Sequence, residues 1–259
     1  MSIVSVTLKE NYDKDGYIKL NKVLDDDLVM EAKAHIDWLM TKHPHLRPEH
    51  LYTGTLEMDP FWHRLISDDR LLDIAEQFIG PDIALFASGY ISKPPFDGRM
   101  VPWHQDGAFW PLEPMNVVSL WLAVDDSTTE NGCLRVIPGT QNLELKAMNA
   151  APMNAVFEQE VDPKYVDETK AVDLELKAGG VSIHNPLIIH GSNANLSPNR
   201  RCGLTIRYIP TTTRIISDKQ WTSAYLLRGE ARPGINEYMP KPKYVPGEHM
   251  AFRGSESYR

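Results

Sequence analysis

Hydrophobic and polar positions along the chain change their spacing near residue 83. Before it, hydrophobic residues recur every three or four positions in two segments, a period typical of helices packed on one face. The first segment begins at the acidic run Asp25–Asp27, whose carboxylates can cap a helix, and extends to Lys42. Its repeating hydrophobic positions are Val29, Ala32, Ile36 and Leu39. The second covers about residues 70–78 and is ended by Gly80-Pro81.

From residue 83 onward, short hydrophobic runs rich in β-branched and aromatic residues alternate with turn residues. Asn131-Gly132 and Gly179-Gly180 are two such turns. The expected strands cover residues 83–91, 101–106, 117–124, 134–137, 172–176, 181–184 and 203–209, with one earlier strand at 16–20. This spacing favours a mainly β sandwich or closed barrel with flanking helices over βαβ units.

Two segments lack a clear period. Residues 143–168 are polar and are expected to form a long insertion near the mouth of the barrel, and residues 228–259 are rich in Pro and Gly. We therefore expect one domain over residues 1–259, in which residues 1–82 are mostly helical support. Residues 83–210 would form the barrel core and residues 211–259 an irregular C-terminal strap.

Composition narrows the class of protein. Hydrophobic residues make up 42% of the 259 residues, which suffices for a sizeable core. The net charge of −8 disfavours nucleic acid or an anionic membrane as a partner. The sequence contains no run of 18 apolar residues, so no membrane span is expected. Cys133 and Cys202 form no CxxC pair, so we expect reduced core thiols and a cytoplasmic location.

The first candidate chemistry is the pair His104 and Asp106. If both lie on the expected strand, side chains two residues apart point to the same side and can hold one metal ion. A second His-x-Asp sequence, at His35 and Asp37, lies on the first expected helix, where residues two apart diverge. We therefore expect metal binding at the strand pair alone.

A third ligand is needed, and His184 and His190 are the candidates. Two histidines and one carboxylate with open coordination positions are typical of iron(II) oxygenases. Arg201 begins an apolar run beyond His190, and its planar guanidinium suits a bidentate carboxylate such as that of 2-oxoglutarate. Arg207 lies an even number of residues beyond Arg201, so both side chains point to the same face of a strand, and Arg207 is the alternative for that role.

Four spaced motifs in order resemble the phytanoyl-CoA dioxygenase family. They are Val101-Pro-Trp-His-Gln-Asp-Gly, Trp121-Leu-Ala-Val-Asp-Asp, Glu130-Asn-Gly-Cys-Leu-Arg-Val-Ile-Pro-Gly-Thr, and His190-Gly-Ser followed by Asn195, Ser197 and Arg201. The resemblance implies a double-stranded β-helix (jelly-roll) barrel with the N-terminal helices outside. It also implies roles for individual residues: His104, Asp106 and His190 as iron(II) ligands, Arg201 as the 2-oxoglutarate anchor, and Trp121 and Ser192 beside the co-substrate.

The resemblance further implies an oxidoreductase that consumes 2-oxoglutarate and O2 and oxidises a substrate, most simply by hydroxylation. Asp106 argues against halogenation, because related halogenases carry a small residue there. Desaturation or cyclisation, or a cupin-type barrel that binds a ligand without turnover, are the alternatives. We expect a free small molecule of biosynthetic metabolism rather than a CoA thioester, and the oligomeric state stays open.

Side chains that could bind this substrate are mostly aromatic. The aromatic candidates are Trp103, Phe109, Trp110 and Trp221, and the candidates for an anionic group are Arg99 and Arg214.

Overall fold

The computed structural model describes residues 3–52 and 54–259, and side chains from residue 8 onward within the first helix. Four α-helices precede the main strands. They are α1 (Ile3–Asp15), α2 (Asp26–Lys42), α3 (Pro60–Ile66) and α4 (Asp69–Ile79). Helix α2 begins where the sequence predicts, because the Asp25 carboxylate accepts from the N–H of Leu28, and Gly80 ends α4 at a φ of 82°.

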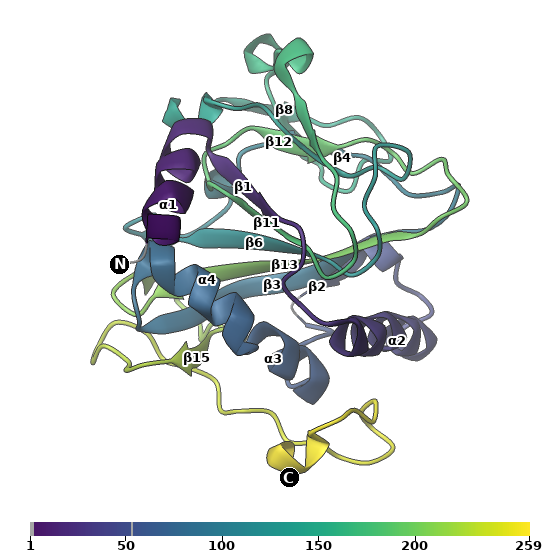
Figure 1. Cartoon of the computed structure of the whole chain (residues 1–259), viewed down its shortest axis with the longest axis vertical. Coiled ribbons are helices and arrows are strands. Elements are labelled where there is room, and N and C mark those ends of the chain that lie inside the picture. The colour runs from purple at the N-terminus through teal and green to yellow at the C-terminus, as the bar shows by residue number, and fades with distance from the viewer. Residues whose placement is uncertain (1–2, 53) are drawn as a thin grey trace.

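The strands form two main sheets that face each other (Figure 1). The larger sheet has the order β1-β11-β6-β13-β3-β15, with β2 beside β3, and the smaller has the order β10-β7-β12-β4. The larger sheet comprises β1 (Tyr17–Leu20), β2 (Leu51–Tyr52), β3 (Ile83–Lys93), β6 (Val118–Ala123), β11 (Val181–His184), β13 (Arg201–Pro210) and β15 (Tyr225–Arg228). The smaller comprises β4 (Val101–His104), β7 (Leu134–Val136), β10 (Val172–Leu174) and β12 (His190–Ser192).

Two further antiparallel pairs complete the β-structure: β5 (Leu112–Glu113) with β14 (Arg214–Ile215), and β8 (Met148–Ala150) with β9 (Gln159–Val161). The mainly β jelly-roll with outer helices is confirmed, although the two sheets are not hydrogen-bonded into one closed barrel. The expected insertion at residues 143–168 contains the β8–β9 hairpin. The tail is not wholly irregular, because β14 and β15 lie within it.

The larger sheet separates the hydrophobic core from the site, because side chains alternate between the two faces of a strand. On β13, Cys202, Leu204, Ile206 and Tyr208 belong to the main core cluster, which includes residues of α2, α3 and α4. The residues between them face the smaller sheet. The helices thus stabilise one face, and the other is left for polar chemistry.

Helices α1 and α3 were not expected from the sequence. Helix α3 is buried almost all round, so it has no polar face to produce a helical period. Its start could have been recognised, because the Asp59 carboxylate accepts from the N–H of Trp62 and Pro60 follows the cap. Helix α1 is held through Tyr12, which is buried against Phe78 of α4.

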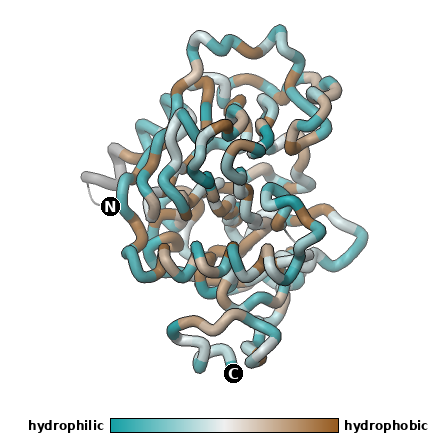
Figure 2. The backbone as a smooth tube through the Cα atoms, turned by 90° about the vertical axis from the view of Figure 1, so that its right-hand side faces the viewer, coloured by the Kyte–Doolittle hydropathy of each residue, from teal (hydrophilic) through white to brown (hydrophobic). Residues whose placement is uncertain are grey.

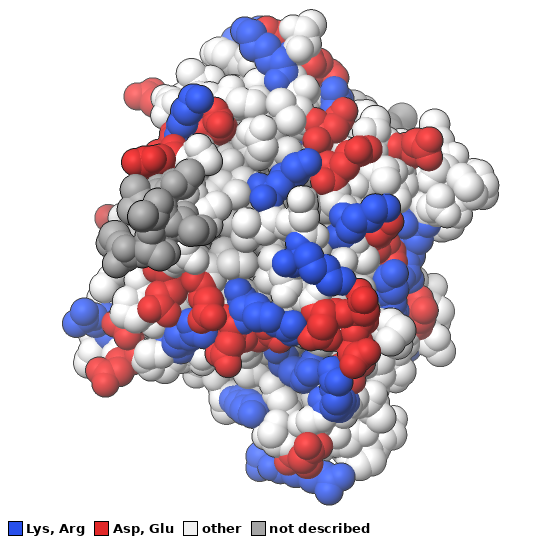
Figure 3. All heavy atoms as spheres, in the orientation of Figure 1, with Lys and Arg blue, Asp and Glu red and all other residues white. Residues whose placement is uncertain are grey.

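Hydropathy and charge are mixed along the chain. Hydrophobic and hydrophilic positions alternate along most of the trace in Figure 2, and no described helix is long and apolar enough to cross a membrane. On the face shown in Figure 3, Lys and Arg lie beside Asp and Glu. Arg228, for example, contacts Asp69, Asp73 and Glu76 within 2.9 Å.

Candidate metal and co-substrate site

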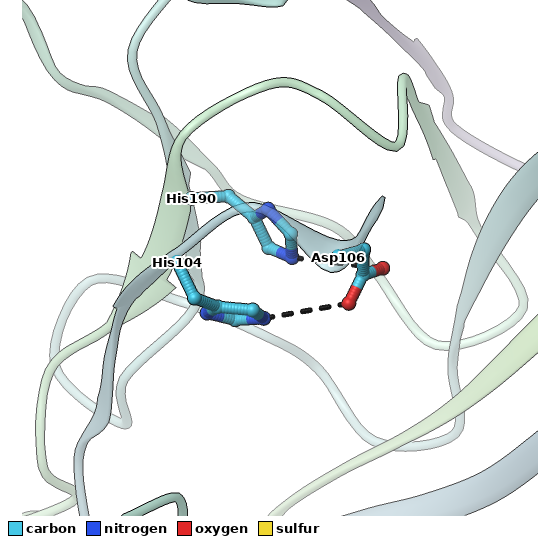
Figure 4. Close-up of side chains that lie close together, drawn as sticks. All are labelled: His104, Asp106 and His190. Carbon is cyan, nitrogen blue, oxygen red and sulfur yellow. Dashed lines mark ion pairs between the residues drawn. The ribbon is translucent and has the colours of Figure 1, made fainter. Parts of the chain in front are cut away.

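Two histidines from neighbouring strands of the smaller sheet lie directly opposite each other. His104 ends β4, His190 begins β12, and the two residues are partners in the antiparallel register. Their ring centroids are 4.1 Å apart, and Asp106 faces both rings (Figure 4). All three side chains are buried, with at most 4% exposed. One ligand atom from each residue lies within 4.8 Å of the others, close enough to bind one metal ion.

Backbone carbonyls fix the orientation of both imidazoles. The Nδ1 of His104 lies 2.8 Å from the carbonyl of Pro102, and the Nδ1 of His190 lies 3.0 Å from the carbonyl of Ile188. A carbonyl only accepts, so each Nδ1 carries the proton and each Nε2 presents its lone pair toward Asp106. This is the arrangement that orients histidine ligands in metal sites.

The electrostatics of the cluster favour an ionised carboxylate at Asp106 and a neutral imidazole at His190. Burial raises the pKa of Asp106, but the groups around it, the Arg207 guanidinium first, outweigh burial and hold that pKa well below its usual value. Burial and the nearby His104 hold the pKa of His190 well below its usual value. The Oδ2 of Asp106 is buried without a hydrogen-bond partner. An ionised carboxylate with an unsatisfied oxygen beside two lone pairs fits a divalent cation.

The strand argument for His104 and Asp106 is wrong in its geometry. Strand β4 ends at His104, and Asp106 is the first residue of a 3₁₀ turn, Asp106–Ala108. The chain turns the carboxylate back toward the imidazole, and Oδ1 of Asp106 lies 3.5 Å from Nε2 of His104. Gln105 points elsewhere, since its amide donates to the carbonyl of Leu187 and accepts from the N–H of Lys146.

His184, the alternative third ligand, also lies at the cluster. Its Nε2 is 3.5 Å from Oδ2 of Asp106, closer than the 3.9 Å of His190. However, the Nδ1 of His184 has no hydrogen-bond partner among the described residues, so no backbone group fixes this ring. The distance to Asp106 alone favours His184. The group whose ligand atoms all lie within 4.8 Å of one another contains His190 and not His184. Orientation also favours His190, because a metal ligand must present its lone pair.

A pair of buried cations lies deeper between the sheets. Lys93 and Arg201 are partners in the β3–β13 register, and their side chains converge on Oγ of Ser192 at 2.6 and 3.3 Å. Arg201 also donates to the carbonyls of Gly132 and Ile91. Among the described residues, no carboxylate lies within ion-pair distance of either cation. Burial lowers the pKa of Arg201 to about 10, and burial and Arg201 lower that of Lys93. A buried guanidinium and a buried amine without a carboxylate partner fit an anionic co-substrate, whose negative charge would favour the protonated form of both.

Trp121 forms one wall of this cationic end. Its indole lies 5.4 Å from the guanidinium of Arg201. A Cβ on Gly203 would lie only 2.0 Å from the indole, so glycine is required for the ring to lie flat over β13. One small cavity is lined by the three histidines of the cluster and by Trp121, Ser192 and Arg201. The structure therefore brings all six candidate site residues together.

A larger cavity, of about 830 Å³, opens beside Asp106. Its inner wall includes Gly89 of β3 and Thr205 and Arg207 of β13, while residues of the β8–β9 hairpin form the rim. Its volume is typical of small-molecule sites. Phe109 and Trp110 line it as expected.

Other expected substrate residues lie outside this cavity. Trp103 packs against Arg135, and Trp221 stacks on Phe86 and donates to its carbonyl, so neither lines this cavity. Arg99 does not line the cavity, and Arg214 donates to backbone carbonyls near residue 235.

The helical pair His35 and Asp37 diverges as predicted. The imidazole of His35 is fully buried between Tyr90 and Asp59. Asp37 pairs with Arg200 at the surface.

Sequence reasoning missed Lys93 as a site residue. It had one usable signal: this lysine ends an apolar run, directly before Pro94-Pro95, on a strand that is buried throughout. A lysine in such a place needs a polar or anionic partner.

Comparison with known proteins places these residues in context. A family model described as "Phytanoyl-CoA dioxygenase (PhyH)" matches residues 12–203. The L-proline trans-4-hydroxylase of Streptomyces griseoviridis is 28% identical, over 77% of this chain and 84% of that protein. The peroxisomal phytanoyl-CoA dioxygenase of Rattus norvegicus is 25% identical, over 84% of this chain and 72% of that protein.

Solved structures support the fold. The non-heme monooxygenase ThoJ, in its apo form, superimposes with a TM-score of 0.77 at 22% identity and covers 91% of this chain and 88% of its own. EctD from S. alaskensis with bound Fe gives a TM-score of 0.70 at 24% identity and covers 90% of this chain and 88% of its own.

Proposed function

This chain belongs to the phytanoyl-CoA dioxygenase family of iron(II)- and 2-oxoglutarate-dependent oxygenases, and from that premise we propose that it hydroxylates a free small molecule bound in the cavity beside Asp106. One observation carries the proposal. Two imidazoles of fixed tautomer and an ionised carboxylate meet between a pair of buried cations and an open cavity. A barrel that only binds a ligand has no need for all three features.

In this proposal His104, Asp106 and His190 hold the iron(II) and leave coordination positions open. The bound metal supplies the activation of O2 that is coupled to the conversion of 2-oxoglutarate into succinate and CO2. Arg201 and Lys93 bind the distal carboxylate of 2-oxoglutarate, and Ser192 donates or accepts beside it. These contacts orient the co-substrate toward the histidines.

The chain's other contribution is to exclude water and position the substrate. Trp121 covers the cationic end, so the co-substrate carboxylate is paired in a dry environment. Phe109 and Trp110 offer aromatic surface to the substrate. Asp106 occupies the position that a halide would need, which supports hydroxylation over halogenation.

A free small molecule fits the cavity better than a CoA thioester. Among the residues that line the cavity, Arg207 is the one lysine or arginine, whereas the several phosphate groups of CoA would require a basic cluster. The relative named for L-proline acts on a small molecule by that name. We further propose a cytoplasmic location, which the two buried free thiols of Cys133 and Cys202 support.

The test is turnover with purified protein, iron(II), 2-oxoglutarate and O2. We expect succinate in the wild type, none in His190→Ala, and the gain of one oxygen atom in a substrate identified by mass spectrometry. Wild-type protein that binds iron(II) and 2-oxoglutarate without producing succinate would contradict the proposal.

A further inference from the structure

Arg207 is the one lysine or arginine among the residues that line the large cavity, and it is neither a candidate iron ligand nor the proposed 2-oxoglutarate anchor. It lies on β13, six residues beyond Arg201 on the same face of the sheet. Its Nη1 donates to Oγ1 of Thr205 at 2.8 Å, and its guanidinium lies 5.3 Å from the ring of Trp110. These two contacts hold the guanidinium against the cavity wall.

One edge of this guanidinium has no hydrogen-bond partner. Its Nε is buried and unsatisfied among the described residues, and its Nη2 lies 3.7 Å from Oδ1 of Asp106, beyond hydrogen-bond distance. Nε and Nη2 lie on the same side of the planar group and form the fork that a carboxylate takes with two parallel hydrogen bonds. Elsewhere in this chain, Arg47 uses that edge on Glu49, with both distances 3.0 Å. At Arg207, among the described residues, no hydrogen-bond acceptor occupies this edge.

The charged side chains around Arg207 also favour the binding of an anion there. Two carboxylates line the cavity, Asp106 and Glu158. Asp106 is a candidate metal ligand, and a metal dication would share its negative charge. Glu158 is exposed at the rim. The one buried counter-charge near Arg207 among the residues that line the cavity is therefore Asp106, whose charge the metal would share, and a ligand carboxylate would supply a counter-charge of its own.

We propose that Arg207 binds a carboxylate of the primary substrate, so that the enzyme oxidises small carboxylic acids, amino acids included. This rests on the proposed function, because the cavity is the one beside the candidate iron site. A single guanidinium with one neutral hydroxyl neighbour matches a singly charged carboxylate, whereas a phosphate dianion would call for more cations.

Binding can be tested without turnover. The protein is loaded with manganese(II) and N-oxalylglycine, an inert analogue that fills the 2-oxoglutarate site and keeps other acids out of it. Valerate, phenylacetate, L-proline and L-leucine are then titrated, each beside its primary amide, and binding is followed by saturation-transfer NMR. The amide keeps the shape of the acid and removes the charge.

We expect at least one acid to bind and its amide to bind at least about tenfold more weakly. Arg207→Gln should weaken binding of that acid by about thirtyfold or more, as for the loss of one partner of a buried charge pair. Arg207→Lys should recover part of the loss, because a point charge cannot form the fork. Arg214→Gln, which removes an arginine outside the cavity, is the matched control and should bind the acid as the wild type does.

The inference is wrong if no acid binds, if amides bind as well as acids, or if Arg207→Gln keeps its affinity for the acid. It is also wrong if Arg207→Gln loses manganese(II) by the same factor, since Arg207 would then act by positioning Asp106. Succinate formation by the wild type separates the two proposals: if succinate forms, a negative binding result overturns only the role of Arg207. If none forms, the proposed function itself fails.

Discussion

Lys93 and Arg201, which face each other across β3 and β13, both donate to the hydroxyl of Ser192. Like charges are rarely buried side by side, and here burial lowers the pKa of both. The pair is explained if the bound carboxylate of 2-oxoglutarate completes it. This end of the site should therefore control co-substrate affinity, while the three metal ligands control chemistry.

Arg201→Ala should raise the 2-oxoglutarate concentration needed for half-maximal succinate formation by two to four decades. Removing one partner of a buried charge pair costs about 3–5 kcal/mol. Arg201→Lys should recover only part, and Lys93→Met, which keeps length without charge, should show a smaller defect of the same kind. A mild effect of Arg201→Ala beside a large effect of Arg207→Ala on 2-oxoglutarate would show that the anchor is Arg207.

Each metal-ligand variant should lose the metal and keep the fold. His104→Ala, Asp106→Ala and His190→Ala are expected to abolish manganese(II) binding in isothermal titration, because each removes one of three ligands. Circular dichroism should stay unchanged, since the main hydrophobic core lies on the other face of the larger sheet. His184→Ala is the matched control and should still bind manganese(II). If His190→Ala binds it fully and His184→Ala does not, His184 is the third ligand.

The reaction outcome should not change in the presence of halide. With an identified substrate, 2-oxoglutarate, O2 and excess bromide, the wild type should give only the oxygenated product, because Asp106 occupies the position that a halide would need. Asp106→Ala is expected to be nearly inactive, since it removes a ligand together with its charge. Mass spectrometry of the products decides the matter. Brominated product from the wild type would mean that Asp106 does not bind the metal.

His63 should make the protein sensitive to acid. Burial, with a smaller contribution from Lys241, lowers the pKa of His63 from 6.5 to about 4. The unfolded chain binds a proton below pH 6.5 that the folded chain does not bind until about pH 4, so stability is lost as the pH falls through that window. The loss from this group should reach roughly 2–3 kcal/mol at pH 4.5.

Urea denaturation at pH 7 and pH 4.5 measures this loss, and His63→Gln should reduce the difference between the two. His45, shortly after the end of α2, is exposed, so His45→Gln serves as the control. An unchanged difference in His63→Gln would contradict the assignment.

The sequence was informative where one face of an element is buried and the other is not. The cap at Asp25 and the hydrophobic period after it predict α2 to within a residue at either end. Because side chains alternate between the two faces of a strand, the even spacing of Arg201 and Arg207 predicts that they share a face of β13, and the structure shows this.

The sequence pattern was less informative about elements that are buried on all sides and about places where a turn follows a strand. Helix α3 has no polar face, and β3 is buried on both sides, so neither the helix nor the importance of Lys93 appears as a period. Asp106 meets His104 through a 3₁₀ turn that alternation does not anticipate. Trp103 and Trp221 are partly buried aromatic residues packed against small hydrophobic clusters, and composition alone does not distinguish such residues from those of a substrate pocket.

The most direct test is a crystal structure of the protein with manganese(II) and N-oxalylglycine, using anomalous scattering to locate the metal. We expect one anomalous peak bounded by Nε2 of His104, Nε2 of His190 and the carboxylate of Asp106. The far carboxylate of the analogue should lie within hydrogen-bond distance of Arg201. A peak ligated by His184 in place of His190, or an analogue carboxylate on Arg207 with Arg201 free, would contradict the assignment of the site.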